Sequence, residues 1–301
     1  KPDPLAAGVP IVEGYHAVFP LREAEIEALF PLIGSRLAVS VVNSAYQRRH
    51  FPDNQYLSIS ERPAWELLER LADVHPRFAH YAFRGACGLE PCPSAPAVVS
   101  WLRGSAAAIG PLLDPDPRTA PRVVFDFGVG SLTSGTPAVW ADAGLSARKI
   151  ARRMEEAGAA IGIGCYDEVR GVYTSPAFSK PGNDGPSSRT VHLGLDLFAP
   201  PGTTVLAPLD GVVHSIADNA SPLDYGPTVV LEHDTGPGGP RFHTLYGHLA
   251  RGSSAGLSAG DRVSAGTRLA RIGAIDENGG WPPHLHFQVI TDLLGRLGDF
   301  P

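Results

Sequence analysis

The sequence has few cysteines: Cys87, Cys92 and Cys165 are the three among 301 residues. An odd number at irregular spacing does not form a disulfide framework, so the cysteines favour a reducing compartment and predict a cytoplasmic protein. As metal ligands, Cys87 and Cys92 are less favoured than as buried or surface thiols. The sequence also lacks any run of the ~18 apolar residues that a membrane-spanning helix needs, so no membrane span is expected.

An excess of positive charge and a targeting segment are both missing. The net charge of −6 gives no electrostatic argument for nucleic acid or an anionic membrane surface, so we expect neither as a partner. The opening Lys1-Pro2-Asp3-Pro4 lacks the basic segment and following apolar run of a signal peptide, and no initiator Met is present. We therefore expect a fragment or a processed product, for which a missing signal says little about location.

Residues 1–112 have the periodicity of helices. Apolar residues recur at i, i+3, i+4 and i+7 from Ile26, which is one helix face. Pro31 interrupts this pattern, so one helix is predicted to end there and a second to run on to Tyr46. A polar start with an early proline at Ser58–Pro63 predicts a third helix, and the small-residue-rich segment Val98–Leu113 predicts a fourth.

A proline-rich segment follows, with prolines at positions 111, 115, 117 and 121. So much proline cannot sustain a helix or a central strand, so residues 113–121 are predicted to be a linker between domains. Residues 122–186 predict an α/β extension, with a strand at 122–127, a helix at 146–157 and two strands within 160–173. This extension matches no motif, and we expect it to pack on the domain that follows.

From residue 187 to residue 301, short apolar strands alternate with Gly, Pro and Asp at the turns. Regular short strands between turn signals are typical of antiparallel β architecture. The whole chain is therefore predicted to be α+β and multidomain, with an α-helical domain at 1–112 and a mainly antiparallel β domain at 187–301. A turn-rich loop is predicted at 179–188, just before this last domain.

Two short segments of this last domain carry polar residues at strand spacing. His192 and Asp196 are four residues apart, and His284 and His286 are two apart, so each pair shares one face of a strand. Two imidazoles and a carboxylate from neighbouring strands make a site that suits Zn²⁺ with three protein ligands and one open position. One of the two late histidines would remain for proton transfer.

The region from about 187 to 301 resembles a LytM/lysostaphin-type zinc metallopeptidase domain. The resemblance is carried by His192-Leu-Gly-Leu-Asp196, Tyr246-Gly-His248-Leu249 and His284-Leu-His286, in the order and separation of that family. It implies that His192, Asp196 and His286 are the zinc ligands and that His248 and His284 are the catalytic pair around the metal-bound water. Which of these two histidines is the base stays open. The family's substrates are peptidoglycan cross-links or stem peptides. The turn-rich loop ahead of His192 would cover the cleft or regulate access to it.

Two aromatic residues near these motifs are candidates for substrate binding. Tyr246 would share a strand face with His248 if that strand is regular, and Trp281 would form a wall of a substrate groove. Packing alone is an equally good interpretation of each. The sequence departs from the family at Gln288, where Glu is frequent, so a carboxylate role next to His286 is in doubt.

The helical stretch has a looser resemblance of its own. Val12-Glu-Gly-Tyr15, the segment 36–43 and the segment 56–60 resemble the end of the helical lobe of aminoglycoside-phosphotransferase/choline-kinase-like proteins. The His-Gly-Asp motif of that family and a Gly-rich phosphate loop are missing, so no phosphotransferase activity is expected. The combination resembles the middle slice of multidomain proteins that join kinase-like, LytM-like and class III aminotransferase domains.

We therefore expect a zinc-dependent amide or peptide hydrolase, with a peptide or muropeptide-like substrate and with flanking domains of a longer polypeptide as partners. A cytoplasmic location favours small peptides, recycled muropeptides or another amide over intact cell wall. Two alternatives stay open, a zinc-binding scaffold that positions flanking catalytic domains and a peptide-binding module without turnover. A scaffold needs the ligands but not His248 and His284, whereas an enzyme needs all five.

Overall fold

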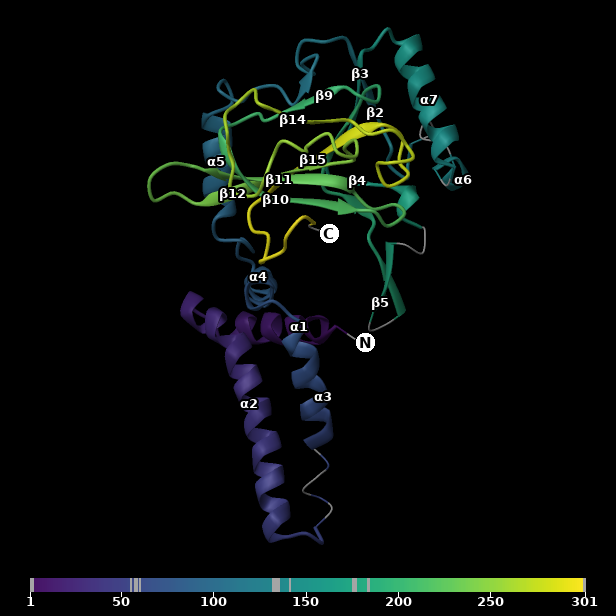
Figure 1. The fold of residues 1–301 in the computed structure, drawn as a ribbon. Coiled ribbons are helices and arrows are strands. Elements are labelled where there is room, and N and C mark those ends of the chain that lie inside the picture. Colours follow the sequence, from purple (N-terminus) through teal and green to yellow (C-terminus); the bar gives the residue numbers. More distant parts are fainter. Residues whose placement is uncertain are drawn as a thin grey trace. The chain divides into compact units, whose positions relative to one another are not determined.

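A computed structural model describes residues 3–54, 56, 59, 61–131, 136–140, 142–174, 178–182 and 185–299. The architecture is α+β: helices make up the N-terminal part, and sheets dominate the C-terminal part (Figure 1). The chain forms two compact units, one of Lys1–Pro93 with Pro181–Pro186 and one of Ser94–Lys180 with Ser187–Pro301. Among the described residues, no helix combines the length and apolar character that crossing a membrane requires.

The first unit consists of α1 (Pro4–Val18), α2 (Glu23–His50), α3 (Glu61–Ala72) and α4 (Pro76–Ala86). Their buried apolar cluster contains Leu5, Val12, Ile26, Ala79 and Phe83. The predicted break at Pro31 is wrong, because α2 runs through it. One proline removes one backbone hydrogen bond, and the residues that flank Pro31, from 26 to 33, pack against the cluster and hold the helix on both sides. Of the predicted start of the third helix, Ser58 and Ser60 lie outside the described residues.

The second unit contains an eight-stranded sheet in the order β13-β10-β11-β12-β15-β8-β3-β2. Neighbouring strands are antiparallel, except for the parallel pair of β2 and β3. The predicted extension therefore joins the same sheet as the domain that follows it, because β3 pairs with β8. The strands are β2 (Arg122–Phe125), β3 (Ile161–Gly164), β8 (Leu195–Phe198), β10 (Gly211–Asn219), β11 (Gly226–Asp234), β12 (Arg241–Gly247), β13 (Arg262–Val263) and β15 (His284–Ile290).

A second, three-stranded sheet has the order β1-β9-β14, with β1 at Leu113–Asp114, β9 at Thr204–Leu206 and β14 at Arg268–Arg271. β1 lies within the predicted linker 113–121, and its Leu113 pairs with Val205 and is fully buried. β1 lies at the edge of this sheet, so it does not contradict the expectation that the proline-rich segment holds no central strand, and the prolines flank the pair instead of interrupting it. The two compact units divide between Pro93 and Ser94, ahead of this segment.

The remaining elements of the second unit belong mainly to the extension. The helix predicted at 146–157 is part of α7, and the strands predicted within 160–173 are β3 and β4. The predicted helix at 98–113 is shorter, since α5 ends at Gly104. The predicted loop 179–188 is paired as β5 and β6, with residues 183 and 184 outside the described chain. The elements are α5 (Ala95–Gly104), α6 (Pro137–Trp140), α7 (Ala143–Glu156), β4 (Glu168–Val169), β5 (Ser179–Gly182), β6 (Gly185–Ser188) and β7 (Val191–His192), with a 3-10 turn at Gly171–Thr174.

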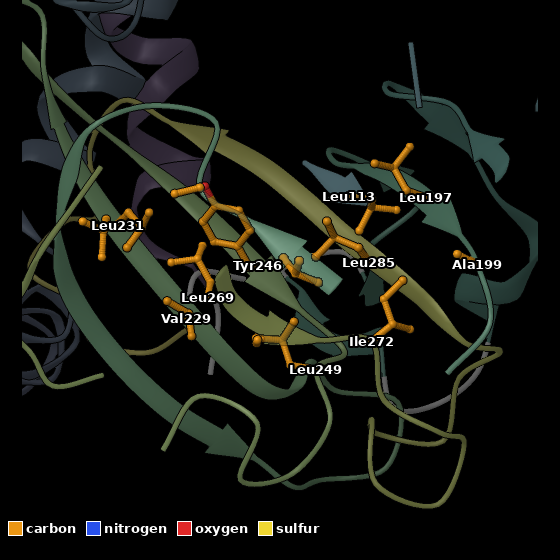
Figure 2. Close-up of a cluster of buried hydrophobic side chains, with 14 of the residues drawn as sticks. Leu113, Leu197, Ala199, Val229, Leu231, Tyr246, Leu249, Leu269, Ile272 and Leu285 are labelled. Atoms are coloured by element: carbon orange, nitrogen blue, oxygen red, sulfur yellow. The ribbon is translucent and has the colours of Figure 1, made fainter. Parts of the chain in front are cut away.

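The main hydrophobic core joins the two sheets. Leu285 of β15 and Leu197 of β8 meet Leu113 of β1 and Leu269 of β14 in one buried cluster (Figure 2). Leu285 lies between His284 and His286, so the alternation of the strand puts the leucine into the core and both histidines on the opposite face. The core therefore fixes which way the polar residues of β15 point.

Truncation of Leu285 tests this dependence on the core. Leu285 is fully buried, so Leu285→Ala leaves a cavity and is expected to lower the free energy of unfolding by about 2–5 kcal/mol. Leu297→Ala is the control, since that side chain is 74% exposed. Urea unfolding followed by circular dichroism measures both, and equal midpoints for the two variants would contradict the assignment of Leu285 to the core.

Candidate metal centre

Paired strands bring the predicted ligands together. In the β8–β15 pair, Asp196 lies directly opposite His286. His192 lies in β7, and its backbone pairs with that of Glu168 in β4. This pairing fixes the position of His192. All three predicted ligands are buried, with exposed fractions of 2–6%. The predicted alternation holds for His284 and His286 in β15. The prediction of one regular strand from His192 to Asp196 is wrong, because the chain leaves strand pairing at Leu193 and Gly194, and the two residues lie in separate strands, β7 and β8.

The three candidate ligand atoms form a nearly equilateral triangle. His192 Nε2 lies 3.0 Å from His286 Nδ1, and Asp196 Oδ1 lies 3.1 Å from each of these two nitrogens. Zinc at about 2.0–2.1 Å from tetrahedral ligands separates those ligands by about 3.3–3.4 Å. The observed triangle is close to one face of such a tetrahedron, so these three residues fit a zinc ion.

The outer nitrogen of each ligand histidine lies near an oxygen that can accept its hydrogen. His192 Nδ1 lies 3.0 Å from the carbonyl oxygen of Cys165, and His286 Nε2 lies 3.4 Å from Oε1 of Gln288. Since these oxygens accept, a hydrogen on each outer nitrogen would leave the lone pairs of His192 Nε2 and His286 Nδ1 on the inner side. Gln288 thus supplies an acceptor to His286 although it lacks the charge of a glutamate. In that tautomer the two inner nitrogens and the carboxylate oxygen could all bind one cation.

Asp196 has a second partner that the sequence analysis missed. Its Oδ2 accepts a 2.5 Å hydrogen bond from Arg170 Nη1, and Arg170 Nε donates to Glu168 Oε2 at 2.8 Å. Burial alone would raise the pKa of the Asp196 carboxyl, but the charge of Arg170 and the neighbouring His192 and His284 hold this pKa well below its usual range. The carboxylate is therefore ionised and ready to bind a cation.

His248 and His284 lie beside the triangle as a pair of neutral rings. Their ring centroids are 4.4 Å apart, and His284 Nε2 is 3.5 Å from Asp196 Oδ1. Each Nδ1 donates to a backbone carbonyl, that of Asn278 at 2.9 Å from His248 and that of Pro282 at 2.6 Å from His284. Burial lowers the pKa of His284 to about 4 and the pKa of His248 well below its usual value. Both Nε2 atoms therefore carry lone pairs at neutral pH.

A cavity of about 380 Å³ opens onto these five residues. Trp281 lines it, and its indole nitrogen donates to the carbonyl of Asp224 at 3.2 Å; its role in substrate binding stays a prediction. The other aromatic residues that line it are Phe127, Trp140, Tyr173, Phe178, Phe198 and Tyr225. Arg189 also lines the cavity. The coverage of this cavity by the segment 179–188 stays a prediction.

Tyr246 does not lie at the cavity, so its predicted role in substrate binding is corrected. Its side chain is fully buried in the core, where the hydroxyl accepts a 3.0 Å hydrogen bond from Thr244 (Figure 2). The prediction assumed a regular strand, but β12 ends at Gly247 and His248 has a φ of 61°. This left-handed residue turns the histidine to the site while Tyr246 stays on the core face. Tyr225 lines the cavity instead, with its ring 5.1 Å from that of His286.

Comparison with known proteins assigns this part of the chain. Residues 190–294 match Peptidase family M23. This segment is a peptidase family M23 domain. A chain described as an uncharacterized metalloprotease of Haemophilus influenzae is 35% identical over 97 residues, which are 32% of this chain and 18% of that protein. The solved zinc-containing peptidase of Vibrio cholerae is 30% identical, with a TM-score of 0.28 over 35% of this chain and 28% of the other.

The other similarity concerns a kinase. Hydroxylysine kinase of Mus musculus is 37% identical over 73 residues, which are 24% of this chain and 19% of the kinase. This similarity supports the kinase-like helical lobe that the N-terminal part of the sequence predicts. The chain spans about a fifth of the length of the curated relatives it matches.

Several groups that support the M23 domain's ligands precede residue 190. They are the carbonyl of Cys165 and the side chains of Glu168 and Arg170. Glu168 and Arg170 are two apart, so strand alternation could have placed them on one face. The carbonyl groups of Cys165 and Asn278 leave no signal in the sequence, because every residue has one.

Gly194 leaves space for the imidazole ring of His286, one of the predicted metal ligands. A Cβ at this position would overlap the imidazole of His286, which is buried and cannot move aside. Gly194→Ala is therefore expected to displace the ring and to reduce bound zinc from one ion per chain to well below one. Zinc analysis after gel filtration, with circular dichroism as a check on folding, measures this. Gly256→Ala is the control, since a Cβ there meets nothing, and full zinc content in Gly194→Ala would refute the close approach.

Proposed function

We propose that the chain is a zinc-dependent hydrolase of peptide or other amide bonds, in which water attacks the carbonyl. The observation that carries this proposal is the triangle of His192, Asp196 and His286 atoms, with the neutral His248 and His284 beside it. The membership of residues 190–294 in Peptidase family M23 supports it. The cavity on the same face offers room for a substrate.

His192 Nε2, Asp196 Oδ1 and His286 Nδ1 would hold the ion. Zn²⁺ bound there would act as a Lewis acid towards the carbonyl and would bring the pKa of a water molecule to about 7. The chain's own contribution is to keep these three atoms fixed, since each ligand is buried and has a second partner behind it. Rigid ligands keep one side of the triangle open to the cavity.

His248 and His284 would move the protons. Both rings donate their Nδ1 hydrogens to backbone carbonyls, which fixes their orientation and leaves each Nε2 ready to accept a proton. Their lowered pKa values keep them neutral in the resting state. A ring that takes the proton of the attacking water would become the imidazolium that returns this proton to the leaving amine.

The substrate class follows from the cavity walls. Aromatic side chains from both the extension and the M23 domain surround it, and they favour an apolar side chain next to the scissile bond. The cytoplasmic location that the cysteine content predicts would argue against intact cell wall. We therefore propose small peptides, muropeptide-like fragments or another amide as substrates.

Loss of either neutral histidine tests hydrolysis separately from metal binding. His248→Ala and His284→Ala are each expected to lower turnover by about 10²–10⁴-fold while one zinc per chain remains, because neither residue is a ligand. His192→Ala is expected to lose both zinc and turnover. The assay is mass spectrometry of a pool of stem peptides and glycine-bridged peptides incubated with zinc-loaded chain, beside zinc analysis.

His50→Ala is the matched control, since His50 lies on the exposed end of α2. Unchanged turnover in His284→Ala and His248→Ala would refute their catalytic role. A zinc-loaded parent that cleaves nothing in the pool would instead favour the scaffold.

The second candidate function, a zinc-binding scaffold within a larger enzyme, has its own support in the first unit. α1 exposes Ile11, Tyr15 and Val18 along one face, and α2 exposes Leu32 and Tyr46, together with Val39 and Val42 between them, on another. Apolar faces of this kind are typical of surfaces that contact another domain. The kinase relatives are much longer than their match to this chain, so we propose flanking domains of a longer polypeptide as the partners.

Trp281 tests the cavity as the substrate site. Removing the indole from the cavity wall is expected to raise KM about tenfold and to leave kcat within a factor of about three, since the ring binds the substrate without touching the reacting atoms. Trp281→Ala is compared with Trp281→Phe, which keeps an aromatic wall. Tyr246→Phe is the control and should leave KM unchanged. An equal KM in parent and Trp281→Ala would place substrate elsewhere.

A further inference from the structure

We propose that Arg170, held between Glu168 and Asp196, is a positioning residue that makes Asp196 bind its metal through a single oxygen. The inference rests on the zinc site of the proposed function but not on hydrolysis. Arg170 and Glu168 both precede residues 190–294, so they are contributions of this chain's extension to the M23 domain.

Arg170 is fixed by contacts on three sides. Its Nη1 donates to Asp196 Oδ2 at 2.5 Å and its Nε donates to Glu168 Oε2 at 2.8 Å. The guanidinium carbon lies 5.2 Å from the ring centroid of Phe127. The side chains of Arg170 and Glu168 are each only 9% exposed. A buried guanidinium with two carboxylate partners has no other low-energy position.

Glu168 is itself fixed, so it can act as an anchor. Its second oxygen, Oε1, accepts a 2.6 Å hydrogen bond from the backbone N–H of Phe127. Its backbone is paired with that of His192 in the β4–β7 pair. The chain of contacts from Phe127 through Glu168 and Arg170 therefore ends at one oxygen of Asp196.

The two oxygens of Asp196 consequently have different roles. Oδ2 is occupied by Arg170, whereas Oδ1 faces His192 Nε2 and His286 Nδ1 at 3.1 Å. A carboxylate whose second oxygen is held by a guanidinium cannot turn to chelate an ion with both. Arg170 therefore keeps the ligand set at two nitrogens and one oxygen and leaves room for the reactants.

Charge and orientation predict opposite effects when Arg170 is removed. By charge alone, loss of a cation beside the ligand carboxylate would strengthen zinc binding. If the orientation of Asp196 matters more, loss of Arg170 would weaken zinc binding, since partners behind metal ligands typically contribute about 10–100-fold to metal affinity. We infer that orientation dominates, because the guanidinium charge is already offset by Glu168.

The test uses the whole 301-residue chain and the metal alone, without substrate. Zinc dissociation constants are measured by competition with a chromophoric chelator, and Co²⁺-loaded samples are compared by visible absorption. Arg170→Gln and Arg170→Lys are both expected to weaken zinc binding by about 10–100-fold. The Co²⁺ band of both should lose intensity, because a released Asp196 binds through two oxygens and raises the coordination number. Glu168→Gln, which keeps Arg170 but weakens its anchor, should shift the affinity in the same direction by less.

Arg251→Gln is the matched control, because Arg251 forms an ion pair with Asp218 while 58% exposed. It should match the parent in affinity and spectrum. Addition of guanidinium ion to Arg170→Gly should restore the parental Co²⁺ spectrum, which a general loss of folding would not allow. Should Arg170→Gln fail to fold, Arg170→Lys and Glu168→Gln decide the question.

The outcomes separate this inference from the proposed function. Equal or tighter zinc binding in the Arg170 variants, with an unchanged Co²⁺ spectrum, overturns the positioning role even if the parent hydrolyses peptides. Weaker binding with an altered spectrum supports the role even if the parent hydrolyses nothing. A parent that binds neither metal overturns both.

Discussion

The approach of three electron-pair donors to about 3 Å is the constraint on which the site depends. His192 Nε2 and His286 Nδ1 lie 3.0 Å apart, and the ionised Asp196 Oδ1 lies 3.1 Å from each. With the imidazole hydrogens on the outer nitrogens, these three atoms would repel one another unless a cation lay among them. The rest of the site keeps these three atoms close together. Oxygen acceptors orient the outer nitrogens of the two ligand histidines, and Arg170 holds Oδ2 of Asp196. Gly194 leaves space for the ring of His286.

The hydrophobic core supplies the rigidity that this repulsion demands. Leu285 and Leu197 lie next to the ligands in sequence but on the opposite face of the sheet, in the cluster that joins the two sheets. A rotation that relieved the crowding of His286 would therefore also displace Leu285 from a fully packed position. Burial of the leucines and presentation of the histidines are thus two consequences of one strand alternation.

The sequence predicts those features that follow from local periodicity. The α+β class follows from helix periodicity and strand alternation, and the common face of His284 and His286 follows from the alternation of β15. The place of His248 beside His284 was implied by the motif resemblance, and the neutral state of both rings follows only from their burial in the fold. Tyr246 was misplaced because one left-handed residue, His248, ends the alternation, and no pattern in the sequence marks that turn. Pro31 was given too much weight, because packing on either side of it compensates for one lost hydrogen bond. Arg170 was missed because Asp196 is 26 residues away, and only the fold brings these two residues together.

The extension before residue 190 therefore belongs to the site as much as to the sheet. β3 pairs with β8, the strand that carries Asp196, and β4 pairs with β7, which carries His192. The turn between β3 and β4 presents the Cys165 carbonyl to one ligand, and the residue that follows β4 presents the Arg170 guanidinium to another. A strand pairing that only enlarged the sheet would not need a buried ion pair at its end, since such pairs contribute little to stability by themselves. The position of that pair behind a metal ligand gives it a reason: it selects one oxygen of one carboxylate.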